Sequence, residues 1–200
     1  MLMLSLAGRG RFYPAYPLIL FKLGLSIIRM TIRLAVSGDI PAIMTLLKTV
    51  VPAMQAAGNY QWDAGYPNEA VFEDDIAKKQ LWVAEVNSAI AGFAAITTDQ
   101  DEEYADVGWD ITETAIVTHR LAVGTQYRGL GIAKALLLQA EKVAVERNIP
   151  VLRIDTNTNN EATKALFPKL GYEYAGDIGL EHRPGLRFCC YEKRLTEPTG

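Results

Sequence analysis

Two glycines, Gly129 and Gly131, join a strand-like segment to a helical one and constrain the fold more than any other feature of the sequence. The segment TAIVTHRLAV at 114–123 is typical of a strand. After the glycines, apolar residues recur at helical spacing, at Ile132, Leu136, Ala140, Val143 and Ala144. A strand that enters a helix through a glycine turn exposes backbone N–H groups at the positive end of a helix dipole. The junction therefore predicts an anion-binding site.

Strands and helices alternate in the rest of the chain. We predict strands at 31–36, 80–86, 89–97, 151–157, 172–178 and 187–195. We predict helices over 40–54, with Asp39 as the cap, and at 72–79 and 160–170, with a loop between 57 and 71. Asn87-Ser88 is predicted to turn a hairpin. Because a helix crosses between strands 114–123 and 151–157, these two strands should pair in parallel.

Composition excludes several classes of protein. The chain has 200 residues, of which 50% are hydrophobic, so one domain with a sizeable core is expected. A net charge of −3 and a pI near 5.5 argue against nucleic acid as a partner. Cys189 and Cys190 are adjacent in a predicted strand and should face opposite sides, so they form no disulfide framework. His119 and His182 are far apart in sequence, and we expect no metal site.

The first 29 residues differ from the rest of the chain. They are apolar without a helical period, and Lys22 with two flanking prolines argues against a membrane span. A signal peptide is an alternative, but cleavage after Ala35-Val36-Ser37 would remove the first predicted strand. We expect residues 1–29 to be a poorly ordered extension or the product of an upstream start, and residues 30–196 to form the domain. The domain is expected to act in the cytoplasm.

The glycine turn fits one of three anion-binding motifs. A dinucleotide fingerprint would need glycine at Lys134, and a nucleotide P-loop would need lysine at Leu130. What remains is Gln126-x-x-Gly129-x-Gly131-Ile132-Ala133, which resembles the acetyl-CoA pyrophosphate loop of the GNAT superfamily of N-acetyltransferases. The triplet Leu121-Ala122-Val123 before the loop and the segment NEATKALFPKLGY at 160–172 are also similar to GNAT motifs.

This resemblance implies a fold and a cosubstrate. The implied fold is α/β, with a mixed, mostly antiparallel central sheet, helices on both faces, and a splayed parallel strand pair at the acetyl-CoA site. The resemblance implies that backbone amides of the loop hold the pyrophosphate, that the preceding strand edge pairs with the pantetheine arm, and that Asn160 binds the arm or its thioester end. The implied acetyl-CoA residues are Leu121, Ala122, Val123, Arg128, Gly129, Leu130, Gly131, Ile132, Ala133, Lys134, Asn160 and Phe167. A Thr158-x-x-Glu161 capping box should leave Asn160 free for the ligand.

Two residues depart from the family pattern. Phe167 stands where many GNAT members place a tyrosine that protonates the leaving thiolate, so water, Tyr172 or Tyr174 would have to supply the proton. Pro168 lacks an N–H group and should distort the helix near its end. Because of Phe167, a CoA-binding regulatory module without catalysis is the alternative to an enzyme.

Transfer to an amine needs a base. A primary amine with a pKa of about 10.4 is unprotonated in roughly one molecule in 2,500 at pH 7. His119 is the preferred candidate and is similar to the second of two histidines in arylalkylamine N-acetyltransferases; the alternative is a histidine that packs in the core. Glu102, Glu103, Asp110 and Asp155 are weaker alternatives.

The acceptor itself stays open. Four aromatic residues lie in loops where GNAT acceptors enter, namely Tyr60, Trp62, Tyr66 and Trp109, although such residues often only anchor a loop. With the acidic residues Glu69, Glu73, Asp74 and Asp75 nearby, they suit a cationic amine with an apolar portion. We expect direct transfer in a ternary complex, by a monomer or a homodimer.

Overall fold

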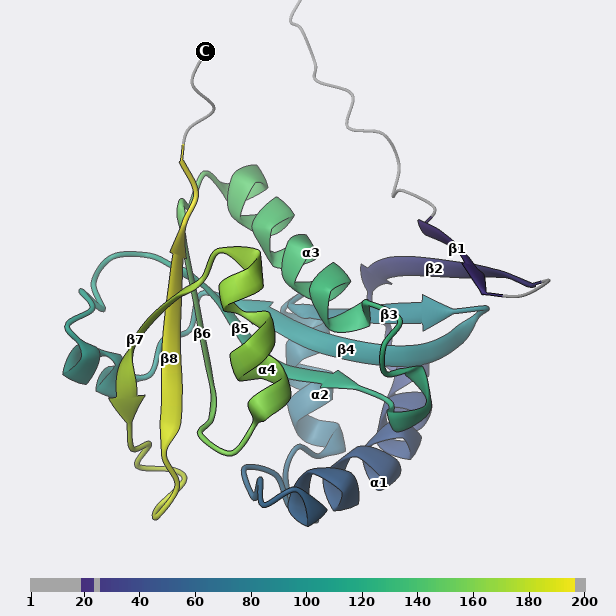
Figure 1. Ribbon diagram of the computed structural model, residues 1–200, viewed down its shortest axis with the longest axis horizontal. Helices are drawn as coiled ribbons and strands as arrows, with labels where there is room; N and C mark the ends of the chain where they lie inside the picture. Colours follow the sequence, from purple (N-terminus) through teal and green to yellow (C-terminus); the bar gives the residue numbers. More distant parts are fainter. Residues whose placement is uncertain (1–18, 24–25, 197–200) are drawn as a thin grey trace, which may run out of the picture.

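An eight-stranded mixed sheet forms the centre of the computed structural model, which describes residues 19–23 and 26–196 (Figure 1). The strands lie in the order β1-β2-β3-β4-β5-β6-β8-β7. Their bounds are β1 Ile19–Leu23, β2 Ser26–Leu34, β3 Leu81–Val86, β4 Ala89–Thr97, β5 Ile116–Val123, β6 Val151–Asn157, β7 Glu173–Ile178 and β8 Phe188–Arg194. Only β5 and β6 pair in parallel among these strands. The predicted fold class and the predicted parallel pair are confirmed.

Helices cover both faces of the sheet (Figure 1). The helices are α1 Ile40–Ala56, α2 Glu69–Ala77, α3 Ile132–Arg147 and α4 Glu161–Leu166. Alternate residues of β3 point to opposite faces, so Val83 packs with α1 and α2 in one core, whereas Ala84 packs with α3 in the other. Cys189 and Cys190 likewise belong to different cores, as predicted.

A bulge in β5 opens the sheet. Phe93 of β4 faces Ala122, but Ala95, two residues on, faces His119, so β5 carries one extra residue between these pairs. Within this bulge Arg120 adopts a left-handed conformation with a φ of 53°. On its other side β5 pairs with β6 only at Ile116 and Val117. The two strands then diverge, which is the predicted splay (Figure 1).

Local sequence signals explain several turns. Asn87 and Ser88 both have positive φ angles and turn the predicted β3–β4 hairpin. The last α-helical turn of α4 ends at Leu166, and Pro168 begins a 3₁₀ turn to Leu170, which is the predicted distortion. Asp39 occupies the cap position of α1, but its carboxylate accepts hydrogen bonds from Arg33 and the Val36 amide rather than from α1 amides.

Strands also occur inside the expected N-terminal extension. β2 begins at Ser26, and β1 pairs with it antiparallel from Ile19 to Leu23. The pairing of β2 with β3 starts at Met30, the expected first residue of the domain. Residues 1–18 lie outside the described residues, as do 24–25 and 197–200. None of the helices in the described part of the chain is long and apolar enough to cross a membrane.

Candidate active site

The glycine turn leads directly into α3. Gly129 and Gly131 have φ angles of 80° and 75°, a conformation that side chains rarely tolerate. A Cβ atom at either position would meet no heavy atom within 4 Å, so open space lies beside both residues. Gly131 is the N-cap of α3 and offers no side chain to its first amides. Arg128 and Lys134 are exposed on either side of the turn. The turn can therefore hold an anion with backbone N–H groups and two nearby cations.

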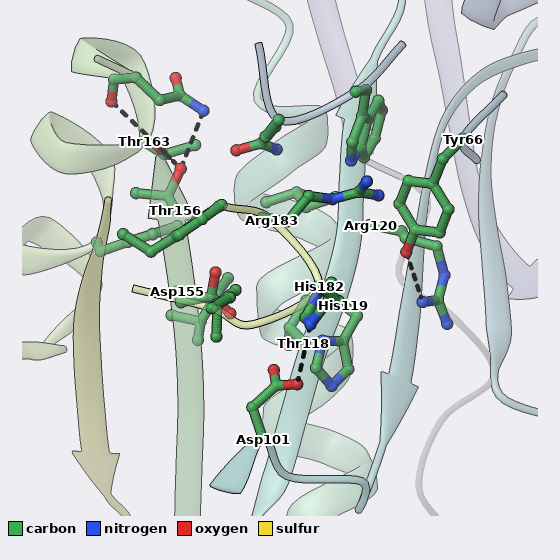
Figure 2. A pocket seen from close by; sticks show the side chains of 18 residues that line it. Tyr66, Asp101, Thr118, His119, Arg120, Asp155, Thr156, Thr163, His182 and Arg183 are labelled. Atoms are coloured by element: carbon green, nitrogen blue, oxygen red, sulfur yellow. Dashed lines mark hydrogen bonds and ion pairs between the residues drawn. The ribbon is translucent and has the colours of Figure 1, made fainter. Parts of the chain in front are cut away.

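A pocket lies where β5 and β6 separate (Figure 2). Four parts of the chain line it: the α1–α2 segment with Gln61, Trp62 and Tyr66; β5 from Thr118 to Leu121; β6 with α4, from Ile154 to Phe167; and the β7–β8 segment with His182 and Arg183. Asp101, from the segment after β4, also reaches it. These parts are far apart in sequence, so the fold alone assembles the pocket.

His119 lies in this pocket in one defined tautomer. Its Nε2 atom is 3.0 Å from the backbone carbonyl of Asp99. Because a carbonyl oxygen can only accept, Nε2 carries the hydrogen, and in the neutral ring Nδ1 is left with a free lone pair. One ring nitrogen and one carboxylate oxygen each from Asp101 and Asp155 lie within 4.8 Å of one another. His119 can therefore accept a proton between two carboxylates.

Tyr104 fixes the side chain of Asp155 through a hydrogen bond. The Tyr104 hydroxyl, which is fully buried, donates to the Asp155 carboxylate at 2.8 Å. Burial raises the pKa of Asp155 above its ordinary value, and the charge of a protonated His119 would lower it. Burial and the neighbouring carboxylate also hold the pKa of Tyr104 well above its usual range, so the phenol stays a donor.

Comparison with known proteins identifies the architecture. The sequence profile of the acetyltransferase (GNAT) family matches residues 47–172. This chain belongs to the GNAT family. A GNAT acetyltransferase from Streptococcus agalactiae is 29% identical, with a TM-score of 0.72 over 84% of this chain and 97% of its own. A candidate acetyltransferase from Staphylococcus aureus is 31% identical, with a TM-score of 0.62 over 82% of this chain and 99% of its own.

A more distant structure carries a ligand. It is a candidate acetyltransferase from Salmonella typhimurium, solved with its cofactor acetyl-CoA. It is 18% identical, and its TM-score is 0.61 over 86% of this chain and 96% of its own. This likeness shows the same fold, whereas the family match and the two more similar structures show that the chain is an acetyltransferase.

The residues expected to bind acetyl-CoA fall into two groups in this GNAT protein. Arg128 to Lys134 form the glycine turn and the start of α3. Leu121, Asn160 and Phe167 line the pocket, whereas the Ala122 side chain packs in the core, so only its backbone can serve a ligand. Val123 packs against the α3 core in the same way. The loop and the pocket are joined by the edge of β5 that β6 leaves unpaired.

Asn160 lines the pocket, but the capping box predicted for Thr158 and Glu161 is absent. Asn160 itself occupies the N-cap of α4, with no side-chain cap bond, and its amide donates to Thr156 at 3.1 Å. Glu161 pairs with Lys164 instead of returning to Thr158. The predicted Thr158–Glu161 capping box was therefore wrong, although Asn160 does line the pocket.

Two of the four aromatic residues expected at the acceptor entrance line the pocket. Tyr66 lines it, and so does Trp62, although Trp62 is only 4% exposed and stacks on Phe93. Tyr60 is 60% exposed and lies outside the residues that line the pocket. Trp109 also lies outside, because it packs edge-on against Tyr104 with Arg153 over its ring.

Phe167, which stands where many GNAT members have a tyrosine, is almost completely buried. Phe167 is 1% exposed and packs edge-on against Tyr191. Neither Tyr172 nor Tyr174 lines the pocket. Burial raises the pKa of Tyr172, and the hydrogen bond to Asp177 raises the pKa of exposed Tyr174 to about 12. Both are therefore poorly placed to protonate a thiolate.

Sequence reasoning missed several residues of this site. Four of them lie in segments that connect strands, where no alternation of apolar and polar residues predicts which way a side chain points: Asp101, Tyr104, His182 and Arg183. The acidic run after β4 was a signal of charge, but it gave no indication that Asp101 turns toward His119. Of the weaker candidate bases, only Asp155 lines the pocket.

Proposed function

We propose that this protein transfers the acetyl group of acetyl-CoA to a primary amine by direct attack in a ternary complex, with His119 as the general base. The observation that carries the proposal is the position of His119 at the point where β5 and β6 separate, with Nε2–H held by the Asp99 carbonyl and Nδ1 left to accept a proton. Bound acetyl-CoA supplies the activated acyl group as a thioester.

The chain offers a continuous surface for acetyl-CoA. The amides of Arg128 to Ala133, with open space beside Gly129 and Gly131, suit a pyrophosphate. The unpaired edge of β5 can take up the pantetheine arm as an added strand, with Leu121 facing the pocket and Asn160 opposite. This path ends at His119, so the thioester would reach the proposed base.

Charge at the pocket favours an ammonium ion. The carboxylates of Asp101 and Asp155 lie beside His119 and attract a cation to that end of the pocket. His119 then accepts the ammonium proton, directly or through one water, and the free amine attacks the thioester carbonyl. Asp155, fixed by Tyr104, stabilises the imidazolium that results.

The leaving thiolate takes its proton from water in this proposal. Phe167 cannot donate one, and Tyr172 and Tyr174 lie outside the pocket lining. The same Phe167 is the observation that keeps a non-catalytic CoA-binding module as the second candidate function. A thiolate is a stable leaving group at neutral pH, so we favour the enzyme.

We also infer that the reaction takes place in the cytoplasm, where acetyl-CoA is available. The site is built from one chain, so a monomer or a homodimer suffices. The net charge of −3 gives no support to a nucleic-acid substrate.

Thiol release from acetyl-CoA tests the proposal. The full chain is incubated with acetyl-CoA and a panel of amines: alkylamines, polyamines, aminoglycosides, amino acids and peptides with free N-termini. We expect at least one amine to raise thiol release well above buffer hydrolysis, with the N-acetyl product seen by mass spectrometry. Binding of acetyl-CoA by calorimetry without turnover on any amine would favour the regulatory module instead.

A further inference from the structure

An arginine and a tyrosine from distant segments meet over the pocket. Arg183, in the β7–β8 segment, places its guanidinium carbon 4.3 Å from the centre of the Tyr66 ring, in the α1–α2 segment. Both side chains line the pocket, and Figure 2 shows the guanidinium directed at the ring. This contact places the positive charge over the electron-rich face of the ring. The guanidinium N–H groups donate to no other described residue, so they stay available to a ligand.

Arg183 differs from the other arginine of the pocket. Arg120 donates two hydrogen bonds to Asp75 and a third to the Tyr66 hydroxyl, so its charge is compensated. Among the described residues, no carboxylate forms an ion pair with Arg183. Half-buried beside the ring, Arg183 thus holds a positive charge and free donors in a pocket whose two carboxylates, Asp101 and Asp155, lie beside His119.

The pocket therefore has two ends of opposite charge. Asp101 and Asp155 surround His119 at one end, and Arg183 lies beside Tyr66 at another (Figure 2). A molecule with an ammonium group and a carboxylate matches both ends, whereas a polyamine would bring a second cation toward Arg183. A guanidinium edge binds a carboxylate through two parallel hydrogen bonds, which adds direction to the charge attraction.

We propose that the acceptor is a small molecule of the amino-acid class, with a carboxylate as well as the reactive amine, and that Arg183 binds this carboxylate. The inference rests on the proposed acetyl transfer, because it names the substrate class of that same site. In the bound state the acceptor carboxylate would lie along the edge of the Arg183 guanidinium, and its ammonium group would lie near Asp155 and His119.

Matched acceptor pairs test this assignment. Each pair is an amino acid and the amine left when its carboxylate is removed: L-leucine with isopentylamine, L-phenylalanine with phenethylamine, and L-lysine with cadaverine. We expect kcat/KM to favour the acid of the best pair by tenfold to a hundredfold, the range of a charge-assisted bidentate contact. Arg183→Gln should reduce this ratio at least tenfold. Arg183→Lys should reduce it less, because lysine keeps the positive charge but cannot form two parallel hydrogen bonds to the carboxylate.

A second experiment measures ligand binding and does not depend on catalysis. Calorimetry compares N-acetyl-L-leucine with N-isopentylacetamide, each titrated into the protein saturated with CoA. The wild type should bind the acid at least tenfold more tightly, and Arg183→Gln should lose the difference. Arg187→Gln is the matched control, because Arg187 lies on the same segment but is exposed, donates to the Asp177 carbonyl and does not line the pocket.

The outcomes separate the two proposals. Equal preference for acids and amines, or a ratio that survives Arg183→Gln, would overturn the role of Arg183 while acetyl transfer stands. Weaker acetyl-CoA binding in Arg183→Gln, with the acid preference intact, would assign Arg183 to the cosubstrate and also overturn it. Tight, Arg183-dependent binding of N-acetyl-L-leucine with no transfer to any amine would support the carboxylate site and contradict the proposed catalysis.

Discussion

Arg120 donates two hydrogen bonds to the carboxylate of Asp75, at 2.9 Å and 2.6 Å. Arg120 is the left-handed residue of the β5 bulge, and Asp75 lies on α2. Both side chains are largely buried, with 15% and 4% exposure. The pair therefore ties the strand that opens the sheet to the helix beneath it, next to His119.

Removing one partner of this pair should cost more than removing both. We expect Asp75→Leu to lower the free energy of unfolding by about 3–5 kcal/mol, because it leaves the Arg120 charge buried and unpaired. Arg120→Met combined with Asp75→Leu should cost much less than the sum of the single changes. Urea denaturation of the four proteins gives the coupling energy. Additive losses would show that the two side chains act independently.

His119→Gln should lower turnover and leave acetyl-CoA binding nearly constant. Loss of a general base typically costs 10²- to 10⁴-fold, and the acidic limb of the wild-type pH–rate profile should disappear. Stopped-assay rates, calorimetry with acetyl-CoA and the melting temperature are measured together. A variant with a lower melting temperature but wild-type rates and pH profile would show that His119 only packs in the core. Asp155 or a bound water would then be the general base.

Gly131→Glu should abolish acetyl-CoA binding without unfolding the protein. The new carboxylate would occupy the open space where the pyrophosphate is proposed to bind. Gly131→Ala is the control, because it brings the same strain at a φ of 75°, roughly 1 kcal/mol, without the charge. Calorimetry should show lost affinity only for the Glu variant. Unchanged affinity in a folded Gly131→Glu protein would contradict the cradle.

A chain that starts at Met30 should fold and bind acetyl-CoA as well as the full chain. The truncation removes β1 but keeps the described β2–β3 pairing from Met30 to Leu34. A chain that starts at Ile40 is the control, since it loses β2 entirely and should not fold. A melting temperature lowered by about ten degrees or more in the Met30 chain, equivalent to more than 1 kcal/mol, would show that the preceding residues stabilise the domain.

The pH dependence of stability should report on Asp39. Hydrogen bonds from Arg33 hold the pKa of the Asp39 carboxyl below its ordinary value. A lowered pKa stabilises the fold above the unfolded value of about 3.9, and this contribution is lost as pH falls through the folded value. Asp39→Asn should therefore cost about 2 kcal/mol at pH 7 and progressively less below pH 4.

Thermal melts from pH 2 to pH 7 measure this difference. Glu173→Gln, at an exposed position of β7, serves as the comparison and should show little effect at any pH. A cost of Asp39→Asn that stays constant down to pH 2 would mean that the ion pair with Arg33 contributes nothing.

Local patterns in the sequence determined the helices, the strands and the glycine turn of this protein. The period of apolar residues in α1 and α3, the Asn87-Ser88 turn and the kink at Pro168 depend on neighbours in the chain, so they could be predicted from sequence. The turn at Gly129 and Gly131 could be predicted for the same reason, since the positive φ angles there are a property of the glycines themselves.

Only the tertiary structure decided what surrounds His119. The Asp99 carbonyl lies 3.0 Å from Nε2, and Asp155 and Arg183 reach the same pocket from β6 and from the β7–β8 segment. These contacts join residues that are many positions apart in the sequence. The directions of the side chains depend on the β5 bulge and on the conformations of long loops, which no repeating pattern in the local sequence predicts. The sequence by itself therefore determined the family and the glycine turn. The tautomer of His119, the carboxylates beside it and the position of Arg183 over Tyr66 arose only from long-range packing.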